Sequence, residues 1–141
     1  MTTRDEIKQE LQKVLEDGNA LIQKLANRAE LIPFATEYQQ WYTRSLPIVK
    51  TLAPDRFDEF RRYYEADKKR KSVEVVTYTL QDYVNGLAPV ATPSRPPFDH
   101  YQVALSRMLG QVQILASLKS RIDSVLATLR GTFWLILRTA S

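Results

Sequence analysis

Apolar residues recur at helical spacing in the first and last thirds of the chain. In the first third they alternate four and three residues apart, with Gly18 at the one skipped position: Ile7, Leu11, Val14, Leu21 and Leu25. The last third carries a longer stripe of the same kind: Leu105, Met108, Val112, Leu115, Leu118, Ile122, Val125 and Leu129. One apolar face at this period predicts a long amphipathic helix over about 3–30 and another over about 98–130, where Gly131 is a natural stop. Each would span roughly 40–50 Å, and matched lengths favour antiparallel packing.

Shorter helices are expected between the two long ones. Pro33 is expected to be the first residue of a second helix because its missing N–H is not needed there, and Pro47 should kink or end that helix. A third helix should begin near Pro54, where acidic residues in the first turn favour the helix dipole. Gly18, within the first long helix, indicates either a close approach of another helix or a local kink.

The segment before residue 90 combines β-branched residues with a helix-capping pattern. Residues 72–79, SVEVVTYT, favour an extended conformation, but the chain offers no second strand to pair with them, so we expect a connector. Thr79 and Asp82 then predict a capped short helix over 80–85, closed by Gly86.

Together these elements predict an all-α fold. We expect a helical bundle of about five helices, with the long first and last helices antiparallel, over residues 1–131. Residues 132–141 are expected to form a separate apolar tail, because the sequence FWLILRTAS breaks the period of the helix before it.

Composition excludes several classes of protein. The chain has no cysteine, which rules out disulfides and thiolate metal sites and indicates a reducing compartment. Its first residues are too polar for a signal peptide, and no apolar run approaches the ~18 residues that a membrane span needs. We therefore expect a cytoplasmic protein that does not enter the membrane. The net charge of +4 is too small to predict nucleic-acid binding by itself.

The sharpest catalytic candidate is the pair Arg95 and His100. HEPN-type ribonucleases use an arginine four to six residues before a histidine, where the imidazole serves acid–base chemistry and the guanidinium holds a phosphate. The spacing recurs easily by chance in a chain with twelve arginines, and the prolines between the two residues place Arg95 in a loop. The alternative is that His100 is simply a residue of the first turn of the last helix, and the chain is more consistent with a protein that is not an enzyme.

A second candidate is the basic, tyrosine-containing stretch FRRYYEADKKRK. Its cationic side chains could bind the phosphates of a nucleic acid while tyrosines stack on bases: Arg61, Arg62, Lys68, Lys69, Arg70 and Lys71. Residues 55–71 nevertheless contain seven basic and five acidic side chains, so a solvated helix face explains the pattern as well.

Neither a cofactor nor a metal is expected. The acidic pairs have no histidine partners, and four glycines leave no room for a phosphate-binding loop. A cluster of aromatic residues could line a small-molecule pocket, although at helical spacing it is more typical of core: Tyr38, Trp41, Tyr42, Phe57, Phe60, Tyr63 and Tyr64.

The stretch 41–71, WYTRSLPIVKTLAPDRFDEFRRYYEADKKRK, followed by 77–87, TYTLQDYVNGL, resembles the N-terminal helical domain of a group of uncharacterised bacterial proteins. The resemblance covers roughly residues 5–130 and consists of aromatic and proline positions together with the TYTLQDY cap. It implies a link to mobile or defence gene neighbourhoods. Longer members carry a second helical domain, sometimes HEPN-like, and no catalytic residue carries over. Since this chain stops where that domain would begin, we expect its last residues to be a shifted-frame or recombined end.

The function most consistent with the sequence is a non-enzymatic helical interaction module that forms a homodimer, with an unidentified protein partner as a further possibility. The last helix has apolar residues off its main stripe, so its apolar arc is wider than one partner helix can bury: Val103, Leu109, Ile114 and Leu126. The tail adds five consecutive apolar residues to the predicted interface: Phe133, Trp134, Leu135, Ile136 and Leu137. The alternative is that the tail folds back onto its own bundle.

Overall fold

The described part of the protein is built from three long helices and three short ones. The computed structural model describes the backbone of residues 3–89 and 97–140, and the side chains of residues 4–89, 97–122 and 124. In chain order the elements are α1 (Thr3–Ala26), α2 (Leu31–Leu52), the 3-10 helix η1 (Pro54–Arg56), α3 (Phe57–Arg62), α4 (Leu80–Val84) and α5 (His100–Ala140). The described part of the chain contains helices and loops and no strand, which confirms the all-α prediction.

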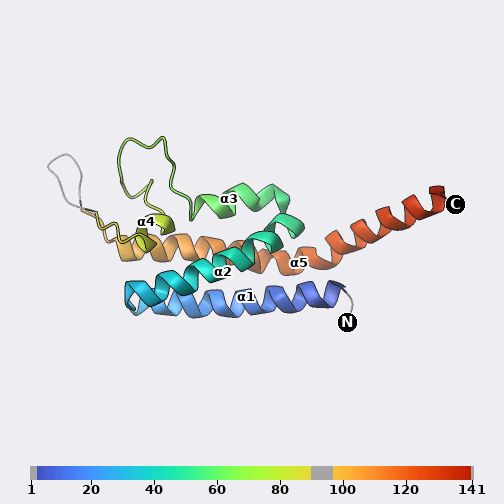
Figure 1. Ribbon diagram of the computed structural model, residues 1–141, viewed down its shortest axis with the longest axis horizontal. Helices are drawn as coiled ribbons and strands as arrows, with labels where there is room; N and C mark the ends of the chain where they lie inside the picture. The colour runs from blue at the N-terminus through green and yellow to red at the C-terminus, as the bar shows by residue number, and fades with distance from the viewer. Residues whose placement is uncertain (1–2, 90–96, 141) are drawn as a thin grey trace.

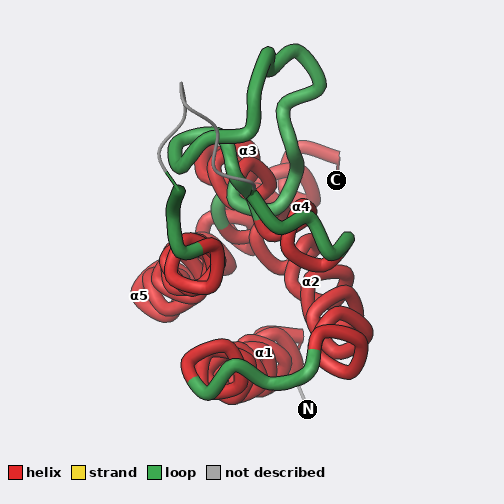
Figure 2. The backbone as a smooth tube through the Cα atoms, turned by 90° about the vertical axis from the view of Figure 1, so that its left-hand side faces the viewer, coloured by secondary structure: helices red, strands yellow, loops and turns green. Residues whose placement is uncertain are grey.

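Helices α1, α2 and α5 form a triangle when the molecule is seen end-on (Figure 2). α1 and α5 pack against each other along their length and run in opposite directions, as expected (Figure 1). The short helices α3 and α4 lie over the side between α2 and α5 and contact both of them. This arrangement encloses one hydrophobic core that draws on every α-helix.

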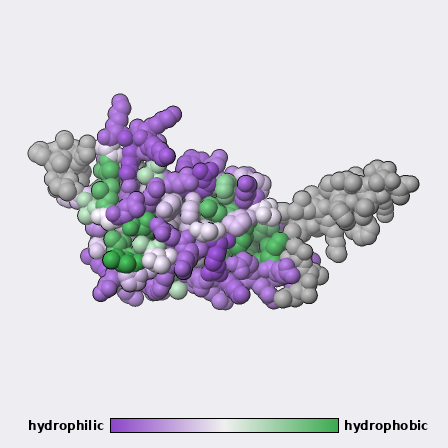
Figure 3. All heavy atoms as spheres, viewed as in Figure 1, coloured by the Kyte–Doolittle hydropathy of each residue, from purple (hydrophilic) through white to green (hydrophobic). Residues whose placement is uncertain are grey.

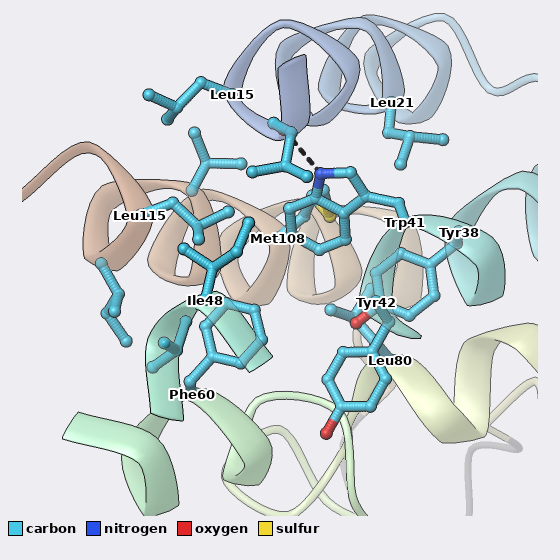
Figure 4. Packing of buried hydrophobic residues seen from close by; sticks show 14 of the residues in the cluster. Leu15, Leu21, Tyr38, Trp41, Tyr42, Ile48, Phe60, Leu80, Met108 and Leu115 are labelled. Atoms are coloured by element: carbon cyan, nitrogen blue, oxygen red, sulfur yellow. Dashed lines mark hydrogen bonds between the residues drawn. The ribbon is translucent and has the colours of Figure 1, made fainter. Parts of the chain in front are cut away.

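The core is formed by the predicted stripes of α1 and α5 and by aromatic residues of α2 (Figure 4). Leu11, Val14, Leu21 and Leu25 of α1 are buried, and so are most members of the α5 stripe. Gly18 lies at a close approach of α1 to α2 and α5: a Cβ placed there would lie 3.0 Å from a methyl of Val112 and 3.1 Å from the Trp41 ring. Of the two explanations for this glycine, the close approach is correct.

A polar network crosses the middle of this core. The side chain of Gln111 is fully buried; its Oε1 accepts a hydrogen bond from the Tyr38 hydroxyl at 2.7 Å, and its Nε2 donates to the Phe60 carbonyl at 3.1 Å. Trp41 adds a hydrogen bond from its Nε1 to the Val14 carbonyl at 2.7 Å. These bonds satisfy buried polar groups and fix α2, α3 and α5 relative to one another.

The first helix ends earlier than predicted. α1 stops at Ala26, not near residue 30, because Arg28 takes the left-handed conformation with φ of 52°. The backbone amides of Arg28 and Ala29 then bond to the carbonyls of Leu25 and Lys24, a Schellman motif. Glycine normally occupies this position, so the sequence lacked the signal that marks such an end.

Pro33 and Gly131 occupy other positions in their helices than predicted, and Pro47 does not end its helix. α2 begins two residues before Pro33, which still lies in the first turn, and the helix continues through Pro47 to Leu52. α5 does not end at Gly131 but continues as one helix to Ala140. The expected stop was therefore wrong, and the tail predicted as a separate segment continues the helix.

The segment before α4 matches the prediction more closely. Residues 72–79 form turns and a connector, with the amides of Thr77 and Tyr78 bonded to the Glu74 carbonyl. The predicted cap of α4 is present: the Thr79 side chain accepts from the Asp82 amide while the Asp82 carboxylate accepts from the Thr79 amide. Gly86 closes this helix with φ of 78°.

Candidate functional site

His100 is the first residue of α5 and lies among aromatic rings. Its imidazole is half-buried beside the rings of Tyr78, Tyr83 and Tyr101, with ring centroids 4.6–6.2 Å apart. Arg95, the other half of the proposed catalytic pair, lies outside the described residues. The described surroundings of His100 thus give it a packing role at the start of α5, and the catalytic pair stays a prediction.

The six basic residues considered for nucleic-acid binding fall into three groups: two arginines of α3, Arg70, and three lysines. Arg61 pairs with Glu65 at 3.0 Å and lies over the Phe57 ring. Both contacts of its guanidinium are therefore to residues of α3 or of the turn that follows. Arg62 is exposed, and its Nε donates to the Asp58 carbonyl at 3.4 Å. Intrahelical contacts of this kind are typical of a solvated helix face.

Arg70 is structural. Both of its terminal nitrogens bond to the two carboxylate oxygens of Asp82 at 2.6 Å, and one of them also donates to the Thr77 carbonyl at 2.9 Å. The Arg70 side chain is 17% exposed and that of Asp82 only 6%. Burial acts to raise the pKa of Asp82, but hydrogen bonds from Arg70 and Thr79 outweigh it and lower that pKa. Arg70 therefore anchors the 65–79 connector to α4.

The three lysines Lys68, Lys69 and Lys71 are exposed on that connector. The loop stands above α3 and α4 in Figure 1, and its surface is strongly hydrophilic in Figure 3. Of the six basic residues, the three lysines and Arg62 are exposed. Asp67 and Glu74 lie exposed on the same loop as the lysines.

Most of the aromatic cluster is core, although Trp41 and Tyr63 also line shallow surface hollows. Tyr38, Trp41 and Phe60 are at most 1% exposed, and their rings stack or tilt on one another at centroid distances of 5.7–6.1 Å. The hydroxyl of Tyr42 is buried there without a hydrogen-bond partner among the described residues. Burial raises the pKa of both Tyr38 and Tyr42, so they stay neutral.

The most open part of the bundle is the end from which α5 leaves it. Beyond Ile122, the last buried residue described on α5, the helix continues to Ala140 away from the other helices (Figure 1). The predicted interface residues 133–137 lie on this overhang, and their side chains are outside the described part of the chain.

Part of the argument for a wide apolar face on α5 was wrong. Ile114 is 1% exposed and Val103 is half-buried against the core, because α1, α2, α3 and α4 together surround the first half of α5. Leu109 remains 41% exposed, and Leu126 lies outside the described side chains. The case for self-association therefore depends on the second half of α5.

A hollow of about 250 Å³ lies at the same end of the bundle, between the first turns of α1 and the last turns of α2. Ile7, Pro47, Ile48 and Leu52 supply its apolar lining, and Glu6, Glu10 and Thr51 lie at its polar parts. On the face shown in Figure 3, hydrophobic atoms reach the surface near this end. This end combines exposed apolar surface with a helix that extends past it.

Searches of the described residues found neither a group of three or more potential metal ligands nor a helix able to cross a membrane. The chain matches no protein-family model, no curated protein and no solved structure. The resemblance suggested by its aromatic and proline positions thus gains no support from these comparisons.

Proposed function

We propose that this protein is a non-enzymatic helical interaction module that self-associates through the second half of α5. The bacterial origin, cytoplasmic location and mobile-element association expected from the sequence belong to the same proposal and have the sequence as their only support.

The observation that carries the proposal is the overhang of α5. Some 18 residues beyond Ile122 form about 27 Å of helix, and no other helix of the described residues lies beside them (Figure 1). Their sequence includes FWLIL, five apolar residues in a row. Isolated helices are marginal in water, and an amphipathic or apolar helix gains most of its stability by packing.

The free energies of apolar burial and of association favour a partner for this segment. Five consecutive residues surround the helix, so about three of them face one partner. Burying one large apolar side chain contributes about 1.5–3 kcal/mol, so three of them offset part of the roughly 4–15 kcal/mol that association costs. A second copy of the chain supplies the same surface, and a two-fold symmetric dimer buries each overhang at once.

Light scattering of the full chain at micromolar concentration tests the proposal. We expect a mass twice the 16.3 kDa of one chain. Leu135→Glu should shift the protein to monomer, whereas Val76→Glu, at an 80% exposed valine on the connector, should leave the dimer intact. A monomeric wild type would refute the proposal.

Nucleic-acid binding is tested separately on heparin and on labelled DNA and RNA. The informative variant changes Lys68, Lys69 and Lys71 to glutamate and leaves Arg70 in place, because loss of Arg70 would damage the fold. We expect the wild type to bind weakly at physiological salt. Submicromolar, salt-dependent binding that this variant abolishes would favour a nucleic-acid-binding domain.

A further inference from the structure

We propose that the hollow between α1 and α2 receives the α5 overhang of a second copy, so that two chains exchange their C-terminal helices. This inference rests on the proposed self-association and names the surface that the overhang occupies.

The size and lining of the hollow suit side chains better than a small ligand. Its volume of about 250 Å³ lies below the roughly 300–1,000 Å³ of most small-molecule sites. Ile7, Pro47, Ile48 and Leu52 give it an apolar floor of the kind that an apolar helix face covers. The overhang of one copy carries apolar residues, and these would cover the floor of the hollow in the other copy.

The charges of the two surfaces are complementary. The ionisable residues that line the hollow are Glu6 and Glu10, and the described lining includes no cationic side chain. Glu10 shares its carboxylate with Arg44 at 3.4 Å, while Glu6 is exposed. The segment 124–141 contains Arg130 and Arg138 and no acidic residue. Attraction between these groups would orient the overhang on the partner.

The position of the hollow suits a symmetric exchange. It lies at the end of the bundle toward which α5 projects (Figure 1). A two-fold axis that sets two bundles end to end therefore carries each overhang onto the hollow of the other copy. An overhang of about 27 Å is long enough to cross from one bundle to the next. The two contacts are identical, as an isologous interface requires.

Cysteine crosslinking between differently labelled copies tests the exchange. The natural chain has no cysteine, so single cysteines report one position each. Copies with Thr51→Cys, at the exposed rim of the hollow, are mixed with copies carrying Thr139→Cys and treated with a short bis-maleimide. We expect a crosslinked dimer of the two. The matched control is Thr36→Cys, an exposed threonine near the other end of α2, which should not crosslink.

A second variant measures the energy of the same contact. Thr51→Arg adds a cation to the hollow and should raise the dimer dissociation constant about tenfold, whereas Thr36→Arg should leave it unchanged. A wild-type monomer would overturn the self-association itself. A wild-type dimer in which Thr51→Cys fails to crosslink and Thr51→Arg has no effect would overturn only the exchange. Crosslinking within one chain of the Thr51→Cys/Thr139→Cys variant at high dilution would also overturn it, by showing that the tail folds back.

Discussion

Replacement of the buried Gln111 by leucine would remove the two hydrogen bonds that its amide makes to α2 and α3. The change leaves the Tyr38 hydroxyl and the Phe60 carbonyl buried without these partners. The Phe60 carbonyl lies in the last turn of α3, where backbone acceptors lack intrahelical donors. A buried polar group left unpaired costs about 1–3 kcal/mol. We therefore expect Gln111→Leu to lower the free energy of unfolding by about 2–4 kcal/mol.

The variant Tyr38→Phe separates the two bonds. Alone, it leaves only Oε1 of Gln111 unpaired and should cost about 1–2 kcal/mol. Combined with Gln111→Leu, it removes the orphaned hydroxyl, so the double variant should be more stable than Gln111→Leu alone by about 1 kcal/mol. Tyr38→Phe would then destabilise the wild type but stabilise the Gln111→Leu variant, and this reversal is expected only if the two side chains are bonded to each other.

Urea denaturation followed by circular dichroism measures these differences. The matched control is Gln113→Leu, since Gln113 is exposed on the same helix and its replacement should change stability by less than about 0.5 kcal/mol. If Gln111→Leu were as stable as the wild type, or if the effects of the two substitutions simply added, the buried network would be refuted.

Three further predictions follow from particular contacts. Arg70→Met should leave the Asp82 carboxylate buried without its partner and cost about 3–5 kcal/mol, whereas Lys69→Met should be nearly neutral in the same denaturation assay. Gly18→Val should clash with the facing helices and cost about 1–3 kcal/mol in thermal unfolding, more than Ala20→Val at an exposed position of the same helix. Burial raises the pKa of four tyrosines: Tyr38, Tyr42, Tyr78 and Tyr83. Because these groups ionise near pH 10 only when unfolded, their contribution to stability should be complete below about pH 10 and fall as pH rises above it. A titration of tyrosinate absorbance in which all seven tyrosines ionise before the protein unfolds would contradict this.

The sequence predicted the α5 core face nearly correctly, with one informative error. Val112 is buried at 8% exposure as assigned, and Leu105 is half-buried, but the positions with no exposed surface between residues 104 and 118 are Ala104, Met108, Gln111, Leu115 and Leu118. These residues keep an uninterrupted four–three spacing. A polar amide at one of them concealed the pattern, because its burial depends on partners from α2 and α3 that only the fold supplies.

A sequence pattern predicted a structural feature correctly where the residues that form the feature are close together in the chain. The cap of α4 was predicted from two side chains three residues apart, and both of its hydrogen bonds form. The end of α1 was missed because Arg28 adopts a left-handed conformation that costs a non-glycine residue about 1–2 kcal/mol. Tertiary contacts of the Arg28 side chain offset that cost, and contacts between distant segments leave no local pattern.

In the candidate sites, too, the sequence showed local patterns but not the contacts between distant residues. The basic stretch was visible in the sequence, but the separation of Arg70 from its neighbours depends on Asp82, twelve residues further along the chain. Spacing alone could not distinguish an arginine that anchors a loop from a lysine exposed on it. The hollow near α5 likewise joins segments some forty residues apart, so periodicity within one helix does not reveal it.

The two ends of the bundle differ in how firmly they are closed, and this difference decides where a partner can bind. At one end, Arg28 donates to Asp99 at 3.1 Å and lies 4.7 Å from the centre of the Tyr101 ring, while Asp99 accepts from the amide of Tyr101 at the start of α5. At the other end, α5 departs from the bundle beside the hollow lined by Ile7 and Pro47. A partner at the closed end would have to replace contacts that already exist. A partner in the hollow at the other end would meet the exposed Glu10–Arg44 pair, a weak surface contact, so less of the gain from burying apolar surface there is offset by the loss of existing contacts.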